Sequence, residues 1–116
     1  MAVNLIRRGD IILTNLSPGR PGEADKIHPA IVVTNNIANL KAPVIVVVPI
    51  TSNLEKVFPF ELELPNNRTG LNKDSKAQVN LIRHVHLNRL IKTLGYMPED
   101  LMLELDARIR EHLALS

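Results

Sequence analysis

The sequence predicts a mainly β protein with a C-terminal α-helix, in which roughly six strands form a small barrel or twisted sheet. Short β-branched runs alternate with turns rich in Pro, Gly and Asn, and the apolar period becomes helical only near the end of the chain. A length of 116 residues suits one domain, which is expected to span residues 1–116.

The first three strands are expected between residues 10 and 51. The run 10–16 (DIILTNL) is apolar and β-branched, and the segment 17–25 that follows is a Pro- and Gly-rich loop. The runs 30–34 and 43–51 are almost continuously β-branched, as in strands with both faces buried. These two strands are therefore predicted at the centre of the sheet.

A fourth strand is predicted at 56–64 (KVFPFELEL), with its Phe and Leu side chains on one face and both Glu side chains on the other. Pro59 lies within this run and indicates an edge strand or a bulge.

Two more strands are predicted after a turn at residues 66–70. The first is 75–82, in which the polar residues Lys76, Gln78 and Asn80 alternate with apolar ones and are expected on one face. The second is a short strand at 90–96.

The C-terminal helix is predicted from its first turn and its apolar spacing. Pro98 suits the first turn, and Glu99 and Asp100 follow where the helix dipole favours acids. The apolar positions at helical spacing are Leu101, Met102, Leu105, Ile109 and Leu113.

The absence of cysteine excludes a disulfide framework, a thiol nucleophile and a thiolate zinc site. A reducing cytosol is then the simplest compartment, so a cytoplasmic protein is expected. The first ten residues lack the apolar segment of a signal peptide, and the longest apolar run, 42–50, is short and broken by proline. No association with a membrane is expected.

The charge is unevenly distributed, although the net charge is only +2. Residues 68–92 hold six basic residues and one acidic residue, whereas residues 93–116 hold two basic and five acidic ones. A basic segment of this kind favours binding to nucleic acid. The only aromatic residues are Phe58, Phe60 and Tyr96, which are too few for a platform of rings that stack on bases.

Several blocks of sequence occur in a characteristic order over nearly the whole chain. They are residues 8–12 (RGDII), 16–18 (LSP), a loop that contains Glu23, 28–33 (HPAIVV), 48–51 (VPIT), 58–61 (FPFE) and 70–75 (GLNKDS). In their order and spacing, these blocks resemble the MazF/PemK family of toxin endoribonucleases.

The resemblance implies an SH3-like twisted small barrel (MazF/PemK/CcdB-like) that forms a homodimer and binds single-stranded RNA in a groove at the dimer interface. It also implies sequence-selective cleavage of mRNA without a metal or other cofactor. Attack by the ribose 2′-hydroxyl would give a 2′,3′-cyclic phosphate and a 5′-hydroxyl. Such toxins inhibit translation and growth, and a cognate acidic MazE-like antitoxin lays an extended tail over the same surface.

The resemblance further implies which residues are catalytic. The family's usual pair is an arginine directly before the proline of the second strand and a threonine at the end of the third. Here the threonine is Thr51, whereas His28 occupies the arginine position. Glu23 coincides with the family's acidic loop residue and is expected to act as a base or to orient His28.

The required chemistry can use a histidine at this position. Cleavage needs a base for the 2′-hydroxyl, an acid for the leaving 5′-oxygen and donors for the phosphoryl oxygens. An imidazole can be the acid or the base, whereas an arginine acts mainly as a charged donor. The Thr51 hydroxyl would bond a non-bridging phosphate oxygen. A structural histidine at His28 and an ordinary strand threonine at Thr51 are the alternatives.

Two groups of residues are expected to bind RNA, with a solvated loop or a solvated face as the alternative for each. Arg20 and Lys26 flank Glu23 and would supply the cation that His28 no longer guarantees. The second group, in the basic segment, comprises Lys73, Lys76, Gln78, Asn80 and Arg83. His84 and His86 would share a strand face, but no third ligand is evident, so no metal site is expected.

Two other functions are compatible with the sequence. Related folds poison a gyrase by binding it, although a gyrase binder has no need of charge directed at RNA. A family member whose catalysis has decayed through the change at His28 would instead be a module that binds RNA or the antitoxin. Fold alone cannot separate these functions.

Overall fold

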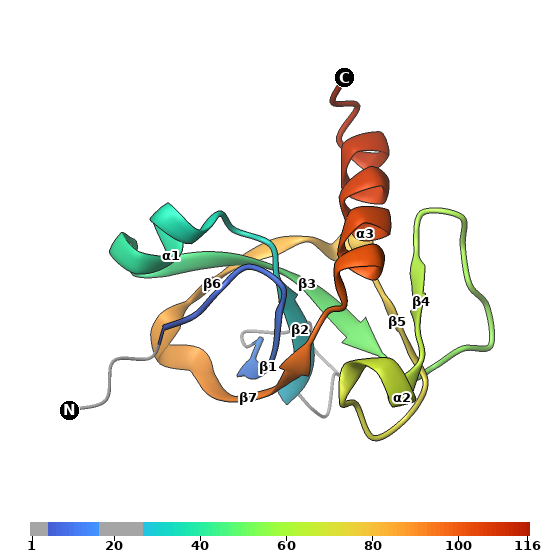
Figure 1. Cartoon of the computed structure of the whole chain (residues 1–116), viewed down its shortest axis with the longest axis horizontal. Helices are drawn as coiled ribbons and strands as arrows, with labels where there is room; N and C mark the ends of the chain where they lie inside the picture. The colour runs from blue at the N-terminus through green and yellow to red at the C-terminus, as the bar shows by residue number, and fades with distance from the viewer. Residues whose placement is uncertain (1–4, 17–26) are drawn as a thin grey trace, which may run out of the picture.

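The structure is a computed structural model that describes residues 5–16 and 27–116 (Figure 1). Its helices are α1 (Asn36–Lys41), α2 (Asn66–Thr69) and α3 (Glu99–His112), and its two short 3-10 turns are η1 (Val79–Leu81) and η2 (Leu87–Arg89). The strands of the described part are β1 (Asp10–Asn15), β2 (Ile27–Val32), β3 (Val44–Thr51), β4 (Leu62–Leu64), β5 (Ser75–Ala77), β6 (Arg83–His86) and β7 (Leu90–Tyr96). The predicted mainly β fold with a C-terminal α-helix is confirmed.

The strands form one curled sheet in the order β4-β5-β3-β2-β1-β7, and β6 also pairs with β3. Every pair of described strands is antiparallel. The central positions of β2 and β3 are those predicted from their continuous apolar sequences. Figure 1 shows α3 standing over this sheet, with α2 at the opposite end of β4 and β5.

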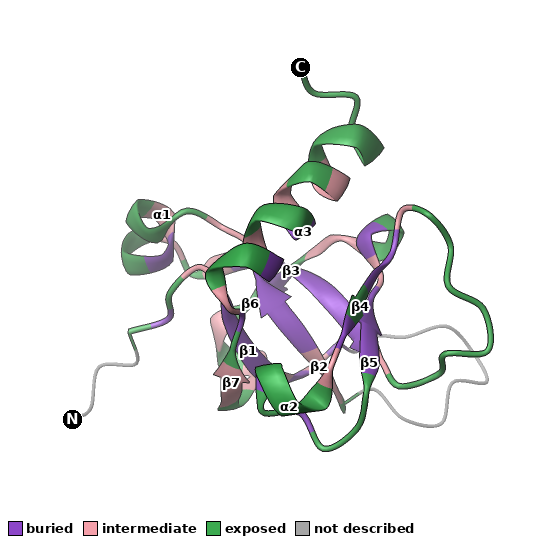
Figure 2. Ribbon diagram, turned by 45° about the vertical axis from the view of Figure 1, so that its right-hand side comes forward, coloured by how far each residue is buried: buried purple, intermediate pink, exposed green. Residues whose placement is uncertain are grey.

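Both faces of the central strands are buried, which explains their continuous apolar sequences (Figure 2). Neighbouring residues point to opposite faces, so Val48 joins a core beneath α3 while Val47 joins a second core on the other face. Ile11 and Ile12 of β1 divide in the same way. The sheet therefore lies between two aliphatic cores, and neither core contains an aromatic residue among its buried members.

Helix α3 confirms the predicted C-terminal helix. It begins directly after Pro98 with two acidic residues in its first turn. Leu101 and Leu105 are buried against the sheet. Leu113, which was predicted in the same apolar stripe, lies past the end of the helix at His112 and is 47% exposed.

The predicted strand 56–64 was wrong over most of its length, because only its last three residues form β4. The residues before β4 form a loop in which the Glu61 backbone N–H donates to the Phe58 carbonyl at 2.9 Å, around Pro59. This turn interrupts the alternation of faces. Glu61 is therefore buried and Phe58 is 38% exposed, the reverse of the predicted pattern.

The predicted strand 75–82 is also shorter, because it ends after three residues as β5. The 3-10 turn η1 follows and buries Val79 in the core beneath α3. Lys76 lies in β5, Gln78 precedes the turn and Asn80 is within it, so the three do not share a strand face as predicted.

Gly95 allows β7 to approach the end of α2 closely. A Cβ at this position would overlap the carbonyl oxygen of Thr69 and lie 3.4 Å from the Cα of Gly70. Gly70 ends α2 with a φ of +81°, a conformation that residues with a side chain rarely adopt. The contact between these glycines positions the start of the connection from α2 to β5.

We predict that Gly95→Ala lowers the free energy of unfolding by about 2 kcal/mol or more, because the new methyl group meets backbone rather than a movable side chain. Unfolding in urea measures the change. Thr93→Ala, at an exposed position of the same strand, is the control and should change stability by no more than about 0.5 kcal/mol. Equal stability of the two variants would contradict the proposed close contact.

Candidate functional site

A cleft of about 510 Å³ opens where the ends of β2 and β3 meet β7 and the connection from α2 to β5. His28 and Thr51 both line it, so the structure brings together two of the three residues predicted to be catalytic. Lys73, from the predicted RNA-binding group, lines the same cleft. The remaining described residues of the lining are Leu13, Ile27, Pro29, Ile50, Ser52, Gly70, Leu71, Asn72, Ser75, Lys92 and Leu94.

The pairing of β2 with β3 brings His28 and Thr51 to the same end of the sheet. In this antiparallel pair, residues 30–32 are opposite residues 47–49, with Ala30 opposite Pro49. His28 lies two residues before Ala30 and Thr51 two residues after Pro49, so both leave the pair at the same end and line the cleft. On its other side, His28 is opposite Thr14 of β1, so the strand that carries it is held on both edges.

The cleft carries cationic side chains and no carboxylate among its described lining residues. Lys73 reaches it from the connection before β5, and Lys92 reaches it from β7. Both side chains are exposed, so they are available to an anion entering the cleft. Together with the imidazole of His28, they make a site suited to a phosphate group.

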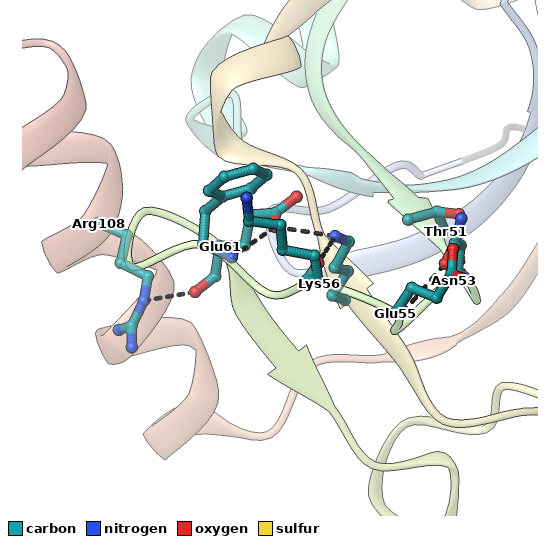
Figure 3. Close-up of polar contacts among 8 residues, drawn as sticks. Thr51, Asn53, Glu55, Lys56, Glu61 and Arg108 are labelled. Carbon is teal, nitrogen blue, oxygen red and sulfur yellow. Dashed lines mark hydrogen bonds and ion pairs between the residues drawn. The ribbon is translucent and has the colours of Figure 1, made fainter.

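The hydroxyl of Thr51 is oriented by the chain that follows β3. Thr51 Oγ1 accepts the backbone N–H of Asn53 at 3.2 Å, and Asn53 Oδ1 accepts the backbone N–H of Glu55 at 3.1 Å (Figure 3). Because a hydroxyl has one donor as well as acceptor lone pairs, this contact leaves the Thr51 proton for another acceptor. A phosphate oxygen in the cleft would be such an acceptor.

A second, smaller cleft of about 200 Å³ lies on the other side of Thr51. Gln78 and Lys76 line it, together with residues of the loop after β3. Gln78 is half-buried and carries an amide that can both donate and accept hydrogen bonds. Thr51 is the residue common to the two clefts, so together they flank it.

Lys76 is not the exposed cation that its sequence context suggested. Its side chain is buried, and Nζ forms an ion pair with Glu61 Oε1 at 2.9 Å. It also donates to the backbone carbonyl of Lys56. No alternation pattern could reveal this pairing, because it depends on the turn that buries Glu61.

The other predicted site residues lie apart from the clefts or outside the described part of the chain. Arg83 donates from Nη1 to the Leu16 carbonyl at 2.9 Å, and Asn80 is exposed in η1. Neither is among the described residues that line the two clefts. The predicted site residues Arg20, Glu23 and Lys26 lie outside the described residues.

Sequence reasoning missed Lys92 and Asn72 as lining residues of the larger cleft. Lys92 belongs to the basic segment, and its place in the predicted strand 90–96 was a usable signal. Its partner in the sheet is Leu13 of β1, a long-range pairing that local sequence does not specify.

Part of the basic segment is neutralised by α3 instead of facing a ligand. Arg68 of α2 makes two hydrogen bonds, of 2.7 and 3.0 Å, to the carboxylate of Asp100. Hydrogen bonding to Arg68 lowers the pKa of Asp100, and the same contact raises the pKa of Arg68. Both side chains are well exposed, so this pair contributes little to stability.

His84 and His86 lie on β6, where both are exposed and pair with β3. Among residues 5–16 and 27–116, no three His, Cys, Asp or Glu side chains gather as metal ligands do. Within the same part of the chain, no helix has the length and apolar character needed to cross a membrane.

Comparison with protein families gives a match over most of the chain. The family model described as PemK-like, MazF-like toxin of type II toxin-antitoxin system matches residues 7–113. The endoribonuclease MazF9 of Mycobacterium tuberculosis (strain ATCC 25618 / H37Rv) is 40% identical in an alignment 116 positions long. This alignment covers 96% of this chain and 98% of the relative.

Solved structures share the fold at lower identity. MazF of Deinococcus radiodurans (Form-I) has a TM-score of 0.80 and 22% identity, over 97% of this chain and 99% of that chain. An endoribonuclease in complex with its cognate antitoxin, from a mycobacterial species, has a TM-score of 0.78 and 19% identity, over 98% of both chains. A MazE-MazF complex of Deinococcus radiodurans (Form-II) is similar, with a TM-score of 0.79 and 21% identity over 98% of this chain and all of that chain.

Proposed function

Because the chain belongs to the family of PemK-like, MazF-like toxins of type II toxin-antitoxin systems, we propose that it is a sequence-selective endoribonuclease, which cleaves single-stranded RNA in the cleft lined by His28 and Thr51. The observation that carries this proposal is that both residues line one cleft. Its described lining residues include lysines and no carboxylate. Such a cleft attracts a polyanion and offers both a proton-transfer group and a hydroxyl donor.

The proposed reaction needs no metal or other cofactor. The 2′-oxygen forms a bond to the adjacent phosphorus as the bond to the 5′-oxygen breaks, which leaves a 2′,3′-cyclic phosphate and a 5′-hydroxyl. One group accepts the proton of the 2′-hydroxyl, and another protonates the leaving 5′-oxygen. We assign His28 to one of these roles, and Glu23 either accepts the proton of the 2′-hydroxyl or orients His28.

The charge that develops on the phosphoryl oxygens needs donors in fixed positions. The Thr51 hydroxyl is held by Asn53 and donates to a non-bridging oxygen in this mechanism. Lys73 and Lys92 supply positive charge from two other elements of the cleft. The RNA on either side would be bound by Gln78 and by the predicted residues Arg20, Lys26, Asn80 and Arg83.

We also propose three partners for this chain. Single-stranded mRNA is the substrate, a second copy of the chain completes the RNA groove in a homodimer, and a cognate acidic MazE-like antitoxin inhibits by covering the cleft. Family members in complex with an antitoxin have the same fold, which supports the last proposal. Since mRNA is cytoplasmic, the toxin would act there and stop translation and growth.

His28→Ala should lower the rate of RNA cleavage by about 10²- to 10⁴-fold, because it removes a proton-transfer group. Thr51→Ala should lower the rate by about 10²-fold, because it removes a hydrogen-bond donor to the phosphoryl oxygens. Cleavage of a single-stranded oligonucleotide in EDTA measures both rates. A matched substrate with deoxyribose at the cleavage site should not be cut. Full activity of both variants would contradict the assigned roles.

His28→Arg separates the proposed mechanism from decayed catalysis. If His28 transfers a proton, the arginine variant supplies a permanent charge but loses that step, so its pH-rate profile should change. Recovery of cleavage by the arginine variant from an inactive wild-type protein would instead identify a decayed enzyme.

Lys73→Ala and Lys92→Ala should each weaken binding of a non-cleavable RNA and reduce the slope of log K against log salt by about 0.7, the value for one lost phosphate contact on a single strand. Titrations at several salt concentrations measure this slope. Lys41→Ala is the control, because Lys41 is exposed at the end of α1, away from the described lining of both clefts. An equal change of slope in all three variants would contradict a specific RNA path through the cleft.

A cognate MazE-like antitoxin, to be sought as a small acidic open reading frame immediately upstream, should inhibit cleavage. Lys73→Ala should weaken this inhibition because the same cation serves both ligands. Inhibition constants for wild type and Lys73→Ala test this expectation, again with Lys41→Ala as the control. Binding of the acidic protein without any inhibition would contradict a shared surface.

A further inference from the structure

The ion pair between Lys76 and Glu61 is the most deeply buried pair of charges in the described part of the chain, at 7% and 5% exposed. Removing two charges from water costs free energy that their attraction only partly offsets, and apolar residues of similar volume often give equal stability. Stability alone is therefore a poor explanation for this pair. Its contacts show what else it does.

The pair holds the backbone of the loop that joins β3 to β4 (Figure 3). Lys76 Nζ donates to the Lys56 carbonyl, and Glu61 Oε1 accepts the Phe58 backbone N–H at 2.9 Å. The carbonyl of Glu61 in turn accepts Nε of Arg108 in α3 at 2.9 Å. Figure 3 shows these contacts in a row from α3 towards the end of β3.

The same loop begins at Thr51. Thr51 and Lys76 are partners in the pairing of β3 with β5, so the cation that holds the far part of the loop comes from the position opposite the candidate catalytic threonine. Asn53 and Glu55 link the near part of the loop to Thr51 through their backbone N–H groups. The loop 52–61 is therefore held at both ends.

Held in this way, the loop forms one wall of the smaller cleft beside Thr51. Lys56 Nζ lies 4.7 Å from the centre of the Phe58 ring, and Phe58 stacks on Phe60 with 5.2 Å between ring centres. These contacts hold an exposed cation in the lining of the smaller cleft, which Thr51 and Glu55 also line, and a cation there suits the backbone of a nucleic acid.

We propose that Lys76 and Glu61 are positioning residues, which hold the loop 52–61 so that Thr51 and Lys56 meet the RNA nucleotides that flank the cleaved bond. This inference rests on the proposed ribonuclease function. It replaces the direct RNA contact predicted for Lys76, because the Lys76 ammonium already donates to two protein acceptors.

Three variants separate positioning from a purely structural role. Lys76→Met leaves a buried carboxylate without its cation and should lower the melting temperature by about 10 °C or more. The double variant Lys76→Met with Glu61→Leu removes both charges and should recover most of that loss. Asp100→Asn, which breaks the exposed pair with Arg68, is the control and should change neither melting temperature nor cleavage appreciably.

The rate of RNA cleavage by the double variant, measured well below its melting temperature, distinguishes a positioning role from a purely structural one. We expect kcat/KM to stay at least about tenfold below wild type, since small displacements of positioning groups carry large kinetic costs. Recovery of kcat/KM to the wild-type value, together with recovery of the melting temperature, would overturn the proposal and leave the pair a structural role only.

Hydrogen exchange of the peptide covering 52–61 tests positioning independently of catalysis. The loss of the Glu61 acceptor for the Phe58 N–H should speed exchange in this peptide in the double variant, with no change in β1. If wild type does not cleave RNA but the exchange increases, the ribonuclease proposal fails while the loop is still held by the pair. Unchanged exchange would overturn the positioning role even in an active enzyme.

Discussion

The antiparallel register of β2 against β3 is the constraint on which the rest of the structure depends. These strands are buried on both faces, so a shift of one residue would move every side chain of one strand into the wrong core. His28 precedes the paired residues of β2 and Thr51 follows those of β3, so both lie at the same end of this pair. Packing of the aliphatic cores therefore also fixes the geometry of the cleft, and the site needs little additional structure to bring these residues together.

The remaining part of the cleft depends on long-range contacts with β7 and α2. The close approach of Gly95 to the end of α2 positions the connection that carries Lys73. The pairing of β7 with β1 brings Lys92 to the same cleft. Two separate segments thus contribute its lysines. In the same fold, the acidic first turn of α3 neutralises Arg68, so the basic segment of the sequence is divided between structure and site.

Strands with a strong local signal were predictable from sequence, and so was α3. The β-branched runs at β1, β2 and β3 have the length and composition of strands, and the spacing of Leu101, Leu105 and Ile109 is helical. The errors at 56–64 and 75–82 arose where a tertiary contact overrides alternation: Glu61 turns inward to meet Lys76, and Val79 turns inward beneath α3. The short helix α1 was missed because six residues carry too little periodicity.

The candidate site was predictable in part, for the same physical reason. His28 lies near the start of β2 and Thr51 is the last residue of β3, and the pairing of these strands follows from their burial. Lys92, in contrast, reaches the cleft because β7 pairs with β1, which is distant in sequence. Lys76 shows the limit most clearly. It alternates with Gln78 and Asn80 in a basic segment, which indicates an exposed cation, but its environment is set by Glu61, fifteen residues away. Whether a charge faces solvent or a buried partner depends on such contacts.

In the proposed mechanism, different cationic and donor residues divide the work of the cleft, so a histidine can stand where the family resemblance implies an arginine. An arginine supplies permanent charge and fixed donors but cannot transfer a proton near neutral pH. In this cleft Lys73 and Lys92 already supply positive charge beside His28. With phosphate charge met by the lysines and a hydroxyl donor supplied by Thr51, the proposed mechanism assigns proton transfer to the imidazole, the step that an arginine cannot perform. In this proposal the lysines carry the permanent charge and the histidine moves the proton.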